Sequence, residues 1–151
     1  MTEDLDEVDK EILYMLQEDA RNTSNSQIAS AIGCSPSTVT KRLDKLKSAG
    51  IIKGYTPNID YDAAGYPLRV LFICKAAITE RGDLLEEVLE ISGVVTATEL
   101  MTGNHNLHIE VVGQHNDDIT DMAFSISKLG IQIDEEVLVK NEYPQPASIF
   151  A

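Results

Sequence analysis

The sequence predicts an α+β protein, with an N-terminal winged helix-turn-helix and a C-terminal ferredoxin-like βαββαβ domain. Up to about residue 50, apolar side chains recur at helical spacing between signals for helix ends. From residue 68 the pattern becomes strand, helix, strand, strand, helix, strand. We therefore expect a helix-turn-helix domain over residues 1–60, a hinge over 61–67, a second domain over 68–143 and a tail over 144–151.

Three helices are predicted in the first domain, each opened by a polar cap. Asp6 is placed to cap the first helix. Ser24 and Gln27 fit the capping box of the second helix. Ser35 caps the third, with Pro36 at the first helical position, where its missing N–H costs nothing. The apolar stripes of the three helices are Leu5, Val8, Ile12 and Leu16; Ile28, Ala29 and Ile32; and Val39, Leu43 and Leu46.

A short turn and a following strand complete the winged helix-turn-helix prediction. Gly33 and Cys34 alone separate the second and third helices, which leaves room only for a sharp change of direction. The third helix is expected to end at Gly50. Residues 51–56 then read as a strand beside it, and Pro57 begins the turn that follows, so we expect a wing here.

The second domain opens with a strand, over residues 68–78, that is apolar on both of its alternating faces. Such a strand is expected to be buried on both sides. Because helices in so small a domain can cover only one face, we expect the other face to meet a second subunit. The tail contains two prolines and cannot continue a central strand. The remaining elements are expected at 83–92 (helix), 94–101 and 107–112 (strands), 117–129 (helix) and 131–140 (strand).

Charge is distributed unevenly along the chain, whose net charge is -13. Between residues 35 and 53 the balance reverses, and a basic patch on an acidic body suits a phosphate backbone. The alternative is a solvated helix face on which lysines cluster by chance. The surplus of acid also suggests a host cytoplasm rich in salt. The patch consists of Lys41, Arg42, Lys45, Lys47 and Lys53, against Asp44 alone.

The third helix is the predicted DNA-reading element. Projected at 100° per residue, its exposed face carries small hydroxyls near the N-terminus and cations further along. Ser37 and Thr38 could approach base edges, whereas Lys41 and Arg42 could reach guanine or phosphate. Lys45, Lys47 and Lys53, at or beyond the C-terminal end of this helix, are expected to contact the DNA backbone. The predicted DNA-binding residues are Ser35, Ser37, Thr38, Thr40, Lys41, Arg42, Lys45, Lys47 and Lys53.

Other residue classes give weaker signals. Cys74 lies in an apolar strand and is expected in the core, while Cys34 reads as a small buried residue or as a redox-sensitive one. His105 and His108 should point to opposite sides of a strand, which disfavours a shared metal. No catalytic motif is present, so neither an enzyme nor a cofactor is expected. The absence of a signal peptide or a membrane-length apolar run predicts a cytoplasmic protein.

The motifs in combination resemble those of the leucine-responsive/AsnC, or feast/famine, transcription regulators. The similarity rests on residues 5–13, residues 35–39 and residues 50–55, and the second half resembles the RAM domain of that family. The resemblance implies homodimers or larger assemblies on pseudo-palindromic double-stranded promoter DNA, with no membrane partner. Two recognition helices would then lie about one DNA turn apart, roughly 34–36 Å. The acidic composition suggests a member from a salt-loving archaeon.

The same resemblance implies an effector site, because many family members bind an amino acid between RAM domains. Their loop between the second and third strands commonly reads Thr-Gly-Asp-Tyr-Asp. Here both carboxylates are amides, Asn104 and Asn106, and a neutral amide is a weaker partner for an ammonium group. The ligand is therefore an amino acid, another metabolite or none, and a purely structural turn is the alternative. The candidate effector residues are Met101, Thr102, Gly103, Asn104, His105 and Asn106.

Two rival functions are also compatible with the sequence. Some haem-pathway decarboxylases resemble the family in fold, but they would use a pocket lined with His and Arg for a large, carboxylate-rich substrate, and the only arginines after residue 60 are Arg69 and Arg81. The chain could also be a sensor that acts through mixed oligomers with related proteins. The basic third helix disfavours both alternatives.

Overall fold

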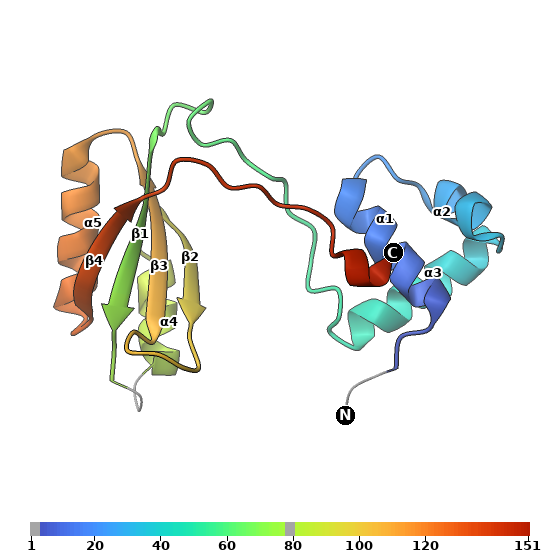
Figure 1. Cartoon of the computed structure of the whole chain (residues 1–151), viewed down its shortest axis with the longest axis horizontal. Helices are drawn as coiled ribbons and strands as arrows, with labels where there is room; N and C mark the ends of the chain where they lie inside the picture. The colour runs from blue at the N-terminus through green and yellow to red at the C-terminus, as the bar shows by residue number, and fades with distance from the viewer. Residues whose placement is uncertain (1–3, 78–80) are drawn as a thin grey trace. The chain divides into compact units, whose positions relative to one another are not determined.

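The computed structural model describes residues 4–77 and 81–151, with the side chains of residues 81 and 82 left aside. The chain forms two compact units (Figure 1). The helix-turn-helix unit consists of Met1–Pro57 together with Tyr143–Ala151, and the sheet unit consists of Asn58–Glu142. The C-terminal tail therefore belongs with the N-terminal helices.

The helix-turn-helix unit contains α1 (Glu7–Asp19), α2 (Asn25–Ile32) and α3 (Pro36–Ser48). The three predicted caps are confirmed. Asp6 accepts the backbone N–H of Asp9, and Ser24 and Gln27 form the reciprocal capping box. These contacts satisfy N–H groups that a helix leaves unpaired at its start.

The core of this unit lies where the three apolar stripes meet. Ile12, Ile28, Val39 and Leu46 are fully buried there. Between α2 and α3 the chain reverses at Gly33, whose φ of 83° is left-handed and whose N–H donates to the Ala29 carbonyl. Glycine adopts this conformation without strain, so this residue sets the angle at which α3 leaves α2.

The strand expected over residues 51–56 is not present in the structure. After Gly50, the N–H groups of Ile51 and Ile52 both donate to the Leu46 carbonyl, at 3.0 and 3.2 Å. These bonds close the end of α3. A strand needs a neighbour with which to exchange backbone hydrogen bonds, and the described part of the chain supplies none to this segment.

The C-terminal tail packs on α1. Its last residues form the short helix η2 (Ser148–Phe150), and Phe150 packs against the helix-turn-helix core. The Ala147 N–H donates to the side-chain carbonyl of Gln17 at 3.2 Å. The sequence predicted only that this segment is not a central strand, and the structure makes it a fourth component of the N-terminal unit.

The sheet unit has the predicted βαββαβ order. Its elements are β1 (Leu68–Lys75), α4 (Arg81–Leu89), β2 (Val94–Glu99), β3 (Leu107–Gly113), α5 (Asn116–Lys128) and β4 (Gln132–Leu138). The strands form one antiparallel sheet in the order β2-β3-β1-β4, which is the ferredoxin-like arrangement. The predicted strand end at Ile78 lies outside the described residues, and α4 ends three residues earlier than expected.

The helices of this unit cover one face of the sheet. Val70, Phe72 and Cys74 of β1 are buried in a cluster that includes Val88 of α4 and Met122 of α5. The alternate side chains of β1, Leu71 and Ile73, are only half-buried. No helix in the described part of the chain is long and apolar enough to span a membrane.

The two cysteines are expected to differ in reactivity. Burial raises the pKa of the Cys74 thiol to about 12, so at pH 8 almost none of it is the nucleophilic thiolate. Cys34 is partly accessible. In the native protein at pH 8 we expect iodoacetamide to alkylate Cys34 but not Cys74, as read by peptide mass spectrometry. Equal labelling of both residues would contradict the burial of Cys74, and labelling in 6 M urea provides the reference.

Candidate nucleic-acid interface

The outer face of α3 carries the predicted small hydroxyls and cations. Ser37, Lys41 and Lys45 are exposed, whereas Val39, Leu43 and Leu46 hold the helix to the core. A helix fixed on one side and polar on the other can present its outer face to a DNA groove. Lys47 and Lys53 are also exposed, and the ammonium of Lys47 lies 5.6 Å from the centre of the Tyr55 ring.

Three hydroxyl groups meet at the N-terminus of α3. The Oγ of Ser35 lies 3.0 Å from that of Ser37 and 2.9 Å from the Oγ1 of Thr38, and it accepts the Thr38 N–H. Hydroxyls can rotate and either donate or accept. Ser35 is therefore the cap of the helix, while Ser37 keeps an exposed hydroxyl close to the helix start, where contact with base edges is expected.

Arg42 is held by α1. Its Nη1 donates to Asp6 at 2.5 Å and to the fully buried Asp9 at 3.2 Å. The backbone N–H of Asp9 and the guanidinium hold the pKa of Asp6 below its ordinary value, and the two carboxylates raise the pKa of Arg42. This predicted DNA-reading residue thus ties α3 to the start of α1, a contact that sequence reasoning missed.

Thr40 is likewise engaged within the unit. Its hydroxyl donates to the Pro36 carbonyl and accepts from the side-chain amide of Asn25 at 3.1 Å. Asn25 is the first residue of α2, so this contact fixes the spacing of the two helices. We therefore separate the predicted set into residues that hold the unit together (Ser35, Thr40 and Arg42) and residues whose exposed polar groups can face DNA (Ser37, Lys41, Lys45, Lys47 and Lys53), with the half-buried Thr38 between them.

The candidate effector loop joins β2 to β3 in the sheet unit. Met101, Thr102 and Asn104 are exposed, and Gly103 has a left-handed φ of 101°. Asn106 is different: its Oδ1 accepts the Ala76 N–H at 2.9 Å and its Nδ2 donates to the Ala76 carbonyl at 2.8 Å. The amide of Asn106 thus pairs with both backbone groups of Ala76, just beyond β1, which a carboxylate could not do.

Replacement of Asn106 by Ala is expected to cost about 1 to 3 kcal/mol in the free energy of unfolding. The substitution leaves both backbone groups of Ala76 without their partner. Urea denaturation followed by circular dichroism measures the change. Asn104→Ala is the matched control, because Asn104 is exposed and its loss should change stability by less than about 0.5 kcal/mol. Equal stability of the two variants would refute a structural role for Asn106.

A carboxylate from β4, that of Asp134, lies next to the loop. The Nε2 of His105 lies 3.0 Å from the Oδ2 of Asp134 on β4, and the Lys75 ammonium lies 3.9 Å from the same oxygen. Sequence reasoning noted that the loop itself carries no acid, but it missed Asp134, which is 29 residues from His105 along the chain.

Arg69 is unavailable for the substrate-binding role that a decarboxylase would require. Its guanidinium forms ion pairs with both Glu110 and Glu142. These carboxylates raise the pKa of Arg69 and hold its side chain at the sheet. This arrangement gives no support to the enzyme alternative.

The fold and the α3 surface define a helix-turn-helix DNA-binding protein with an appended ferredoxin-like domain. Residues 5–53 match the winged helix-turn-helix DNA-binding family. A transcriptional regulator of Pyrococcus furiosus is 32% identical over 83% of this chain and 82% of its own length. The solved structure of Escherichia coli AsnC superposes with a TM-score of 0.75 at 25% identity, over 96% of this chain and 98% of its own. The crystal structure of a Neisseria meningitidis regulator in complex with L-Met superposes with a TM-score of 0.78 at 23% identity, over 96% of each chain. The chain belongs to the Lrp/AsnC family of DNA-binding transcription regulators.

Proposed function

We propose that the chain is a sequence-specific regulator that binds pseudo-palindromic promoter DNA as a homodimer or larger assembly, in a cytoplasm rich in salt. The observation that carries the proposal is α3: a capped helix, anchored through Val39, Leu43 and Leu46, whose exposed side bears hydroxyls and lysines. Ser37 and Lys41 would contact bases, and the lysines near the helix end would hold phosphates.

Assembly through the sheet units is supported by the sheet face that α4 and α5 leave uncovered. Leu71 and Ile73 on β1 are half-buried, and Val137 on β4, which pairs with Leu71 on the same face, is 41% exposed. Apolar surface of this kind is stabilised by a second copy of the same surface. Two α3 helices could then address successive turns of the duplex.

A small molecule bound at loop 101–106, between sheet units, would modulate assembly or DNA affinity. The exposed backbone of this loop and the nearby Asp134 carboxylate support the proposal. Asp134 could take the role of the carboxylates that the loop lacks and pair with the ammonium group of a ligand. The L-Met complex of the Neisseria regulator also makes an amino acid a reasonable ligand class.

The test is a fluorescence-anisotropy titration of the protein against DNA from upstream of its own gene and against genomic fragments. It is run across a range of KCl concentrations, with competitor duplex and with or without a pool of amino acids. We expect tight, competitor-resistant binding that shifts with the pool, and a loss of this shift in Asp134→Asn but not in the exposed control Glu136→Gln. Failure to bind any fragment at any salt concentration would refute the regulator assignment.

A further inference from the structure

A cavity of about 560 Å³ lies in the sheet unit at the end of the sheet opposite loop 101–106. The loop adjoins Leu107, the first residue of β3, whereas the cavity adjoins Gly113, the last. A strand of this length separates its two ends by about 20 Å. The cavity is therefore distinct from the candidate effector loop, and its volume is in the range typical of small-molecule sites.

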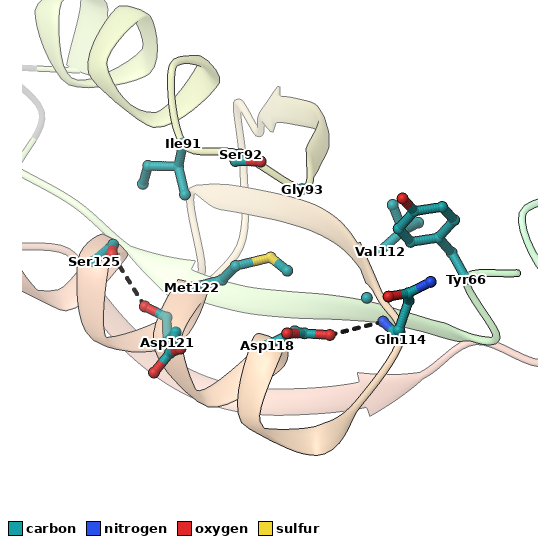
Figure 2. A pocket seen from close by; sticks show the side chains of 11 residues that line it. Tyr66, Ile91, Ser92, Gly93, Val112, Gln114, Asp118, Asp121, Met122 and Ser125 are labelled. Carbon is teal, nitrogen blue, oxygen red and sulfur yellow. Dashed lines mark hydrogen bonds between the residues drawn. The ribbon is translucent and has the colours of Figure 1, made fainter.

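Apolar groups form much of the cavity wall (Figure 2). Met122 of α5 lies across it, next to Gly93, with Ile91 and Val112 beside them and the ring of Tyr66 at one end. Gly93 makes room for Met122: it has a φ of 95°, and a Cβ there would lie 2.6 Å from the methionine sulfur. A thioether and an aromatic ring together suit an apolar or aromatic ligand stem.

The polar groups of the lining are acidic or neutral. Asp118 and Asp121 line the cavity with Gln114, and no Lys or Arg is among its lining residues. The Oδ2 of Asp118 accepts the N–H groups of His115 and Gln114, at 2.8 and 2.9 Å, and these bonds hold its pKa below the ordinary value. Asp118 therefore stays a carboxylate at neutral pH.

Asp121 differs from Asp118 because its carboxylate has no hydrogen-bond or ion-pair partner in the described part of the chain. The Ser125 hydroxyl bonds to the Asp121 backbone carbonyl instead and leaves the carboxylate free. Two carboxylates beside an apolar wall, on a protein of net charge -13, attract a positive charge carried by an apolar group.

We propose that this cavity binds a small organic cation, an ammonium or guanidinium group on an apolar or aromatic stem. The cation pairs with Asp121 and Asp118, and the stem packs between Met122 and Tyr66. This proposal is independent of DNA binding and of the effector loop, since it concerns a different end of the sheet.

The probe is phenethylamine, with 2-phenylethanol as its neutral analogue and 3-phenylpropionate as its anionic analogue. The full-length protein is labelled with ¹³C at the methionine methyl groups, and the amine is titrated in 0.15 M KCl. Met122 lies at the cavity, whereas Met101 is fully exposed in the effector loop. We expect a saturable shift of the Met122 methyl resonance with the amine, little response to either analogue, and no shift of Met101.

Two variants on α5 test the role of charge. Asp121→Asn is expected to weaken phenethylamine binding about tenfold, as loss of one partly screened ion pair requires. Asp117→Asn removes the same charge from the same helix at an exposed position outside the cavity, and its affinity should match that of the wild type. An unchanged Met122 resonance in each ligand-free variant verifies folding.

Several outcomes would overturn the proposal. They are a Met122 resonance that does not move at 10 mM amine, an equal response to 2-phenylethanol, equal affinity of Asp121→Asn and the wild type, and a shift of Met101 alone. The last would place the amine at the effector loop. None of these outcomes bears on DNA binding, which the anisotropy titration tests separately.

Discussion

Replacement of both Lys41 and Lys45 by Ala is expected to weaken binding to the promoter duplex by about 100-fold. Both side chains lie on the exposed side of α3, and each removed cationic contact costs on the order of 1 to 2 kcal/mol. Phosphate contacts also release counterions. The slope of log affinity against log salt should therefore become less steep by up to about two. Fluorescence anisotropy at several KCl concentrations measures both effects.

The control for this experiment is Lys128→Ala combined with Lys140→Ala. This variant has the same net charge as the α3 variant, but both lysines lie outside the helix-turn-helix unit. If the overall electrostatic field of the protein set its affinity for DNA, the two double variants would bind equally weakly. We expect the control to bind like the wild type. Wild-type affinity in the α3 variant would contradict the placement of the DNA surface.

Replacement of Asp9 by Ala is expected to reduce the free energy of unfolding of the helix-turn-helix unit by about 2 to 4 kcal/mol. The Asp9 side chain is fully buried, bonds to the Arg42 guanidinium and receives the N–H of Asp6. The substitution removes the buried one of the two carboxylates that pair with Arg42 and the acceptor of the Asp6 N–H, and the loss of a buried ion-pair partner is destabilising. Hydrogen exchange in α1 and α3, with urea denaturation of the whole chain, measures the loss.

Glu11→Ala is the matched control for Asp9→Ala. Glu11 lies two residues further along α1, is exposed, and loses the same charge when replaced. Its stability should stay within about 0.5 kcal/mol of the wild type. Faster exchange confined to α1 and α3 in Asp9→Ala would support the link between these helices. Exchange equal to that of Glu11→Ala would show that the Arg42 contact contributes little.

The contact between Arg42 and α1 changes how mutations at the DNA surface should be interpreted. Arg42→Ala removes a cation near the DNA face, but it also removes the partner of Asp6 and Asp9. A loss of DNA affinity in that variant would mix altered folding with lost contact. Lys41, one residue earlier and fully on the outer face, separates the two effects.

The tail has a similar consequence for the design of truncated proteins. Residues 1–57 resemble a complete DNA-binding domain in sequence, yet Phe150 and Ala147 contact that unit. The chain thus enters and leaves the sheet unit from the helix-turn-helix unit, which has two covalent connections to it. A fragment that ends before the sheet would expose the part of α1 that η2 covers.

Local signals in the sequence determined the helices, their caps and the polar face of α3. Asp6, Ser24 and Ser35 act on N–H groups within three residues, and the apolar stripes need only the helical repeat. The order of strands and helices was also readable, because alternation and turn residues are short-range patterns. The prediction of a wing strand over residues 51–56 was wrong, because strand formation depends on a partner strand and not on the segment alone.

Only the tertiary structure decided which polar residues are free and which are engaged. Arg42 meets Asp9 across 33 residues of chain, Asn106 meets Ala76 across 30, and Ala147 meets Gln17 across 130. These pairs leave no periodic signal, because their distances are set by how whole elements pack. One missed residue had a local indication: Asp9 lies four residues from both Leu5 and Leu13, on the buried side of α1. A carboxylate in that position needs a buried partner, and packing alone determines that the partner is Arg42.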